Sequence, residues 1–338
     1  MTRPAFPETL PLGEPHEVAE GLWWARLALP FQLNHVNIYL LREDHGWTAI
    51  DTGVNNLESR ENWQKIFAFI GGKSALKRLI VTHHHVDHVG LAGWLASETG
   101  CTVLMSAGEE KTARHALQRD QPDRVARMSA HLRWLGCDDE EIAALTTGLF
   151  RATNYMGPLP EGIGGIAPGD TLRIGNRLWH VLPGKGHSVA PVMLHCPDES
   201  LLIAGDQILS SISPFIGTFG DAPLASPLRD YLAFLDGIEK TLPADTLVLG
   251  GHGRPFDSAL QRIASLKTHH AERCDKIVEA CRARPLTVRA MMVHIFTRKL
   301  DGVMTMALAE VLSHVNLLVD EGRLVAGGSQ EVRTLSAP

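Results

Sequence analysis

The stretch VTHHHVDHVG, residues 81–90, places four histidines and one aspartate within six consecutive positions. The run LKRLIV that leads into it is apolar at Leu79, Ile80 and Val81, which is typical of a buried strand. The segment that follows, GLAGWLASETG, carries apolar residues at helical spacing and ends at Gly100, a common helix stop. The cluster is therefore expected on a loop between a strand and a helix, where α/β folds usually carry their chemistry.

Such a density of imidazole groups either decorates a solvated loop or binds a metal ion. His83 and His85 are two residues apart and would point the same way from an extended loop. Asp87 and His88 begin the following turn and would face a second ion. Neutral imidazole and carboxylate groups are ligands that zinc accepts readily, so the spacing favours the metal site.

Three more candidate ligands stand beside glycines at the ends of apolar strands: His187 in PGKGHS, Asp206 in LLIAGD and His252 in LVLGGHG. Glycine at such a position lets the backbone approach an ion closely. Open positions between two ions are what a hydrolytic two-metal centre needs. We therefore predict one ion at His83, His85 and His187, a second at Asp87, His88 and His252, and a bridge at Asp206.

The ordered series IDTG, HHHVDH, GH, GD and GHG resembles the metallo-β-lactamase-fold hydrolases, and more closely their glyoxalase-II-like branch, over residues 35–257. The resemblance implies an α/β fold, a four-layer αββα sandwich with the metals at one sheet edge, and the same seven ligands. The implied cofactors are two Zn²⁺ ions, although Mn or Fe also accept such ligands. The sequence departs from the family at Lys185, which follows the glycine of PGKGH where a proline usually precedes the glycine–histidine pair.

Hydrolysis at such a centre gives two carboxylates catalytic roles. Asp206 would bridge the ions, and Asp87 would lie close enough to the attacking water to shuttle a proton. Asp51 of IDTG is expected to fix a ligand imidazole, with an ordinary turn aspartate as the alternative. Lys185 and Arg254 stand next to metal ligands and are candidate substrate contacts.

Composition limits the setting of the protein. The 338 residues carry a net charge of −6, and five scattered cysteines form no CxxC pair, so a disulfide framework and a thiolate zinc site are both disfavoured. The chain shows no secretory signal pattern and no apolar run of membrane-spanning length. We expect a cytoplasmic enzyme with a small-molecule substrate and no membrane partner; the sequence leaves its oligomeric state open.

Two domains are predicted. Residues 1–258 would form the catalytic domain with a helical insertion at about 108–169, and residues 259–338 a small winged-helix-like domain. The insertion interrupts the strand order and is expected to cover the active site, where its apolar side chains would either line an acyl pocket or pack against the sandwich. The apolar side chains expected to line that pocket include Met128, Leu132, Trp134 and Met156. On the C-terminal unit, His269 and His270 are expected on a solvated helix face.

Substrate classes divide the family, and the bridging Asp206 disfavours true β-lactamases, which usually lack it. Lactonases of the fold carry a tyrosine three residues further on, where this chain has Leu209. A thioester of glutathione or coenzyme A is the leading prediction. A ribonuclease branch with a C-terminal winged-helix-like unit is the rival, although the net charge of −9 over residues 1–258 makes nucleic acid an unfavourable partner. An iron-dependent sulfur dioxygenase is a further alternative, which metal content would identify.

Overall fold

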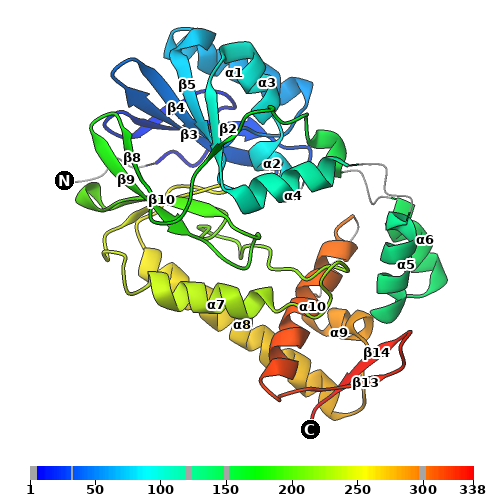
Figure 1. Cartoon of the computed structure of the whole chain (residues 1–338). Coiled ribbons are helices and arrows are strands. Elements are labelled where there is room, and N and C mark those ends of the chain that lie inside the picture. The colour runs from blue at the N-terminus through cyan, green and yellow to red at the C-terminus, as the bar shows by residue number, and fades with distance from the viewer. Residues whose placement is uncertain (1–5, 32, 119–122, 148–151, 297–301) are drawn as a thin grey trace.

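The computed structural model describes residues 6–31, 33–118, 123–147, 152–296 and 302–338. Two β-sheets face each other in its upper part, and helices cover both outer surfaces (Figure 1). A helical unit with a two-stranded hairpin lies below the second sheet. The α/β fold class and the C-terminal helical unit predicted from the sequence are therefore present.

The first sheet is antiparallel in its first half and parallel in its second half. Its seven strands lie in chain order: β1 (His16–Ala19), β2 (Leu22–Ala28), β3 (His35–Glu43), β4 (Gly46–Ile50), β5 (Leu76–Ile80), β6 (Thr102–Met105) and β7 (Gly164–Gly165). A hairpin with Asp44 and His45 in its turn joins β3 to β4. Since β4 and β5 are parallel, Asp51 and the histidine loop leave the sheet at the same edge.

The second sheet has five strands in the order β12 (Leu247–Gly250), β11 (Leu201–Gly205), β10 (Val192–Cys196), β9 (Arg177–Pro183) and β8 (Thr171–Ile174). Strands β11 and β12 are parallel, and β9 runs in their direction because β10 is antiparallel to both β9 and β11. The carboxyl ends of β9, β11 and β12 therefore meet at one edge, where the chain continues to His187, Asp206 and His252.

The helices form the outer layers and the C-terminal unit. They are α1 (Leu57–Ile70), α2 (Val86–Val89), α3 (Ala92–Thr99), α4 (Ala107–Leu117), α5 (Arg124–Trp134), α6 (Asp139–Thr147), α7 (Pro227–Ile238), α8 (Ala259–Arg282), α9 (Val288–Ile295) and α10 (Met304–Asp320). Short 3₁₀ turns span Lys73–Ala75, Ala152–Tyr155 and Pro197–Glu199, and the terminal hairpin pairs β13 (Val325–Gly328) with β14 (Arg333–Ser336). Among the described residues, no helix combines the length and apolarity needed to cross a membrane.

Three apolar cores hold these layers together. Trp24 and Tyr39 from the first sheet meet Trp179 from the second between the two sheets. The outer face of the first sheet is covered by α1 and α3, where Trp63 and Leu95 are fully buried. The outer face of the second sheet shares one core with α7, α8 and the C-terminal helices. The C-terminal unit is thus joined to the sandwich through an extended apolar contact.

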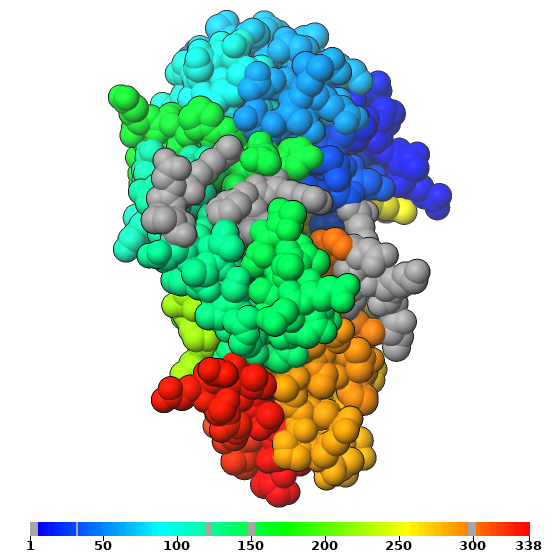
Figure 2. All heavy atoms as spheres, turned by 90° about the vertical axis from the view of Figure 1, so that its right-hand side faces the viewer, coloured from blue at the N-terminus to red at the C-terminus, as the bar shows by residue number. Residues whose placement is uncertain are grey.

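Helices α5 and α6 of the insertion pack against this C-terminal unit. Figure 2 shows them in teal and green between the blue and cyan N-terminal part of the sandwich and the orange and red C-terminal unit. The backbone N–H of Arg289 donates to the carbonyl of Leu135 at 2.9 Å, and its guanidinium pairs with Glu141 at 2.7 Å. Close packing also occurs at Gly136, where a Cβ would lie 2.4 Å from the hydroxyl of Thr287.

The prediction that four side chains of the insertion line one acyl pocket is wrong. Leu132 is buried in the core shared with the C-terminal unit, and Met128 and Trp134 pack against that core. Met156 is buried in a different core, under the outer face of the first sheet. Parts of the insertion, residues 119–122 and 148–151, lie outside the described residues.

The solvated face expected around His269 and His270 is also wrong for His270, which is fully buried between α8 and α10. His270 Nδ1 lies 3.1 Å from His314 Nε2, and His314 Nδ1 lies 2.8 Å from the carbonyl of Glu310. Because His314 donates to that carbonyl from Nδ1, its Nε2 accepts from His270. Burial lowers the pKa of His270 to about 2 and that of His314 to about 4, so both rings are neutral in the fold.

These lowered pKa values make stability depend on pH. The unfolded histidines take up protons below about pH 6.5, whereas the buried rings do not until pH falls much further. Between about pH 6.5 and 4 the unfolded state therefore binds more protons, so the free energy of unfolding falls as pH falls. The expected slope is up to about 1.4 kcal/mol per pH unit for each ring.

Urea denaturation of metal-free protein at pH 7.5, 6.5, 5.5 and 4.5 measures this slope. In His270→Gln, one titrating group is absent, and the amide can still donate to His314. The variant should lose stability less steeply than the wild type as pH falls. Equal slopes for the two proteins would show that His270 does not contribute to the pH dependence.

Candidate metal centre

The structure gathers all seven predicted ligands at one edge of the sandwich. His83 and His85 lie on the loop after β5, and Asp87 and His88 lie in the short helix α2. The loop after β9 supplies His187, whereas Asp206 follows β11 and His252 follows β12. The seven side chains come from four separate segments of the chain, and three groups of them have ligand atoms within 4.8 Å of one another.

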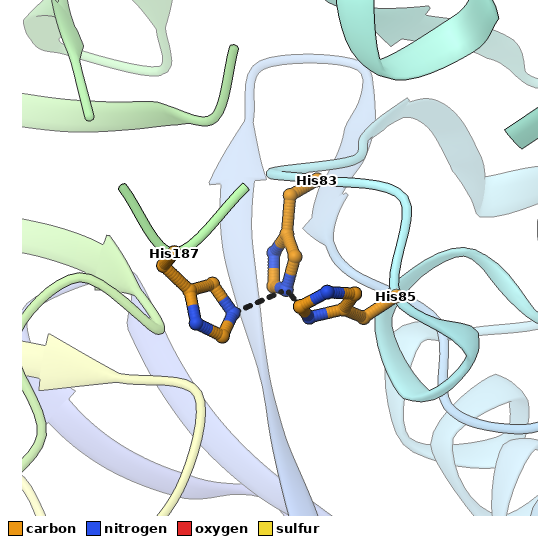
Figure 3. A group of neighbouring side chains, drawn as sticks. All are labelled: His83, His85 and His187. Carbon is orange, nitrogen blue, oxygen red and sulfur yellow. Dashed lines mark hydrogen bonds between the residues drawn. The ribbon is translucent and has the colours of Figure 1, made fainter. Parts of the chain in front are cut away.

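The first group consists of His83, His85 and His187, whose rings point toward one another from two loops (Figure 3). His83 Nε2 lies 3.0 Å from His85 Nδ1 and 3.2 Å from His187 Nε2. Burial is the largest cause that lowers the pKa of each of these three histidines. Their rings are therefore neutral near pH 7 and have lone pairs available for a metal ion.

The second group consists of Asp87, His88 and His252. Asp87 Oδ2 lies 3.3 Å from His252 Nε2 and 3.9 Å from His88 Nε2. Burial would raise the pKa of the Asp87 carboxyl, but the neighbouring His88 and His252 lower it to about 2. Asp87 is thus a carboxylate at neutral pH.

Asp206 connects the two groups. Its Oδ2 lies 3.7 Å from His187 Nε2 and 3.3 Å from His252 Nε2, and its Oδ1 lies 3.5 Å from His88 Nε2. Burial would lower the pKa of His252, but Asp206 and Asp87 raise it to about 10. In the metal-free protein a proton thus occupies a ring nitrogen that faces the cluster, and metal binding must displace it.

Unsatisfied atoms show that this donor set suits metal ions. His88 Nε2 and Asp206 Oδ1 are buried and have no hydrogen-bond partner among the described residues. Buried polar atoms of this kind are costly unless a partner compensates them. Glycine is required beside them, because a Cβ at Gly251 would lie 2.2 Å from Asp206 Oδ1 and 2.6 Å from His88 Cε1. The residues present therefore fit divalent metal ions, which the two ligand groups and Asp206 would hold.

Four of the imidazoles are oriented by a hydrogen bond at the nitrogen that faces away from the cluster, as is usual for metal-binding histidines. The pairs are His83 Nδ1 with Thr82 Oγ1 at 3.0 Å, His88 Nδ1 with Asp51 Oδ2 at 2.8 Å, His187 Nδ1 with the Phe215 carbonyl at 2.8 Å, and His252 Nδ1 with the His35 carbonyl at 2.9 Å.

Asp51 joins the first sheet to the histidine loop. Besides His88, its carboxylate accepts from the backbone N–H of Thr82 at 2.8 Å and from the Thr82 hydroxyl at 2.9 and 3.0 Å. The residue is buried and has a φ of +64°, a region that aspartate tolerates better than most residues. Its place beside a ligand imidazole agrees with the role expected from IDTG.

The two candidate substrate contacts are both exposed. The backbone N–H of Lys185 donates to Gln207 Oε1 at 2.9 Å, and the guanidinium of Arg254 donates to the carbonyl of Phe6 at 2.8 Å. Arg254 therefore also holds the N-terminal segment. A contact of either side chain with substrate remains a prediction.

Two supporting residues were missed in the sequence. Asn37 on β3 donates from Nδ2 to the carbonyls of Gly250 at 2.8 Å and Gly253 at 3.0 Å. These two hydrogen bonds stabilise the turn that carries His252. Glu109 in the first turn of α4 is fully buried beside His84. The one signal for Glu109 was topological: β6 is parallel to β5, so the helix after β6 begins at the same edge as the histidine loop.

Comparison with known proteins agrees with this geometry. Residues 32–252 match the model of the metallo-beta-lactamase superfamily, and residues 274–333 match that of the metallo-beta-lactamase-like C-terminal domain. The Bacillus subtilis (strain 168) protein named probable metallo-hydrolase YqjP is 24% identical over 307 residues, which cover 88% of this chain and 91% of that protein. The acyl-coenzyme A thioesterase MBLAC2 of Bos taurus is 24% identical over 272 residues, or 77% of this chain and 88% of that protein.

A solved structure, that of a beta-lactamase domain protein from Burkholderia ambifaria, superposes with a TM-score of 0.85 at 33% identity. It covers 97% of this chain and 96% of its own. The family and the fold predicted from the five sequence motifs are thereby confirmed. The chain belongs to the metallo-β-lactamase superfamily and is a metal-dependent hydrolase.

Proposed function

We propose that this hydrolase uses two metal ions, zinc by preference, to cleave thioesters of the acyl-coenzyme A or acyl-glutathione type. The observation that carries the proposal is the position of Asp206, within 3.7 Å of one imidazole nitrogen of the first ligand group and two of the second. A carboxylate shared in this way offsets the repulsion between two adjacent cations. The ions, when bound, supply polarisation of the substrate carbonyl and acidification of water.

The chain's own residues complete the reaction. Asp87 stays ionised, because its pKa is about 2, and its side chain is 15% exposed. It can therefore accept a proton from the attacking water and return it to the leaving thiolate. The outward hydrogen bonds hold the ligand imidazoles in place. Because water is the nucleophile, no covalent intermediate with the protein is required.

The surroundings of the centre support an acyl substrate. The rings of Phe31 and Tyr155 pack edge to face with centroids 5.2 Å apart, and Phe31 is partly exposed. The Tyr155 carbonyl lies against Gly90, directly after α2, which places this aromatic pair near the histidine loop. Phe215, whose carbonyl accepts from His187, packs against Phe219. The thioesterase name of the bovine relative points to the same class of substrate.

Metal content is the first test. Protein purified without added metal should hold about two transition-metal ions per chain by elemental analysis, because the chain offers two three-ligand groups. A content that stays at one after zinc titration would contradict the dinuclear centre. A single iron would instead favour the dioxygenase alternative.

Loss of the bridge is the second test. Asp206→Ala should retain at most one zinc ion and lose at least about a hundredfold in kcat/KM, because the two ions would face each other without the shared carboxylate. Asp198→Ala is the matched control, since Asp198 is exposed in the Pro197–Glu199 turn and should leave both values unchanged. Near-normal turnover by Asp206→Ala would overturn its assignment as the bridge.

The substrate class is tested by a parallel assay of the zinc-loaded protein. Acyl-coenzyme A and acyl-glutathione thioesters, simple lactones and a labelled single-stranded RNA should be compared at the same enzyme concentration. Thioester turnover should exceed RNA cleavage by at least about tenfold, because residues 1–258, net −9, offer little attraction for a long polyanion. RNA cleavage that is lost in Asp206→Ala, together with inert thioesters, would establish the nuclease alternative.

A further inference from the structure

Glu109 is a charged residue with no exposed surface, located in the first turn of α4. A carboxylate buried in this way requires several hydrogen bonds to replace its hydration. The structure provides these bonds from two different loops, and both loops carry residues of the first ligand group. Glu109 itself belongs to none of the ligand groups.

The first set of bonds comes from the histidine loop. Glu109 Oε2 accepts from the backbone N–H of His84 at 2.9 Å and lies 2.6 Å from His84 Nδ1. His84 stands between His83 and His85, so the carboxylate fixes both the main chain and the intervening side chain of this loop. The His84 side chain thereby faces Glu109.

The second set of bonds comes from the loop that carries His187. Ser188 Oγ donates to Glu109 at 2.6 and 2.7 Å, and the backbone N–H of Ala190 donates to Oε1 at 2.6 Å. The same helical turn holds this loop at a further point, because the Ser106 hydroxyl donates to the Ala190 carbonyl at 2.7 Å. The beginning of α4 is therefore attached to the residues directly after His187.

The arrangement of Ser188, His84 and Glu109 is not that of a nucleophilic triad. A triad requires the carboxylate and the hydroxyl at opposite nitrogens of the imidazole. Here Glu109 lies 2.6 Å and Ser188 Oγ 2.9 Å from the same atom, His84 Nδ1. The Ser188 proton is directed to Glu109, so the hydroxyl is not activated for attack. The hydrogen bonds of this cluster therefore hold the two loops together and do not activate a nucleophile.

We propose that Glu109 is a positioning residue that sets the distance between the His83–His85 pair and His187, and with it the affinity of the first ligand group for its ion. The inference rests on the metal centre of the proposed function. It predicts a selective effect, because the hydrogen bonds of Glu109 reach the two loops of the first group and none of the second-group residues Asp87, His88 and His252.

Glu109→Gln tests the proposal, since it keeps the shape of the side chain but replaces one acceptor oxygen by a donor. The matched control is Glu110→Gln on the next residue of α4, where the carboxylate is partly exposed and pairs with Arg114 at 2.8 Å. The affinities of the two zinc equivalents are measured by chelator competition, alongside the thermal midpoint of the metal-free protein. These readouts do not depend on knowing the substrate.

Glu109→Gln should weaken one zinc equivalent by at least about tenfold and leave the other within about twofold of the wild type. Glu110→Gln should leave both unchanged. Ser188→Ala removes the hydroxyl contacts with Glu109 and His84 but keeps the bond from the Ala190 N–H. It should weaken the same equivalent and serves as the second variant if Glu109→Gln does not fold. A purely structural role would lower the thermal midpoint without this selectivity.

Wild-type affinities for both ions in Glu109→Gln would overturn the proposal, and so would an equal loss at both. A wild-type protein that binds no more than one ion would instead contradict the dinuclear centre itself. The two failures are therefore distinguishable in one titration.

Discussion

The convergence of the strand ends at the metal centre depends on the contacts of the Asp206 carboxylate. This carboxylate lies within 3.7 Å of imidazole nitrogens from three separate segments, on His88, His187 and His252. Burying a carboxylate costs several kcal/mol unless compensating charges surround it. Those charges reach it only if the ends of β5, β9, β11 and β12 converge at one edge of the sandwich. The topology of both sheets therefore brings Asp206 and these three imidazoles together.

The same constraint explains which features could be predicted from the sequence. Ligands at strand ends must follow apolar runs and stand beside small residues, and both signals are local. His187, Asp206 and His252 each satisfy this rule, and Gly251 lies against Asp206 where a Cβ would be 2.2 Å from Oδ1. Parallel strands then bring their carboxyl ends together, so the convergence of the motifs follows from topology. Local pattern and global fold agree at this edge.

Long-range packing could not be predicted in the same way. The helical periodicity of the insertion indicates that an apolar face exists, but it does not identify the surface that covers it. Leu132 is buried against the C-terminal unit and Met156 under the first sheet, although both lie in the same insertion. The burial of His270 could not be predicted either, because it depends on His314, which lies 44 residues away. Glutamate is usually exposed. Glu109 becomes buried only through loops that the fold brings together.

The loop from Asp206 to Ser226 explains why the C-terminal unit is part of the catalytic scaffold. Loops of this length without regular structure are uncommon unless they have a function. Arg262 of α8 donates to the carbonyls of Leu209 and Ile212 at 2.6 Å, and the backbone N–H of Thr218 donates to the carbonyl of Ala309 on α10 at 3.0 Å. The loop is thus held from the side of the C-terminal helices.

Within this loop, Phe215 supplies the carbonyl that lies 2.8 Å from His187 Nδ1. His187 is consequently positioned from two directions, by α4 through Ser188 and by the C-terminal helices through Phe215. Each support acts on a different side of the same residue. A change in the packing of α8 or α10 would therefore reach the first ligand group through the backbone of the loop, without altering any ligand. The C-terminal unit and the sandwich differ in sequence pattern, but both help to hold the His187 imidazole in position.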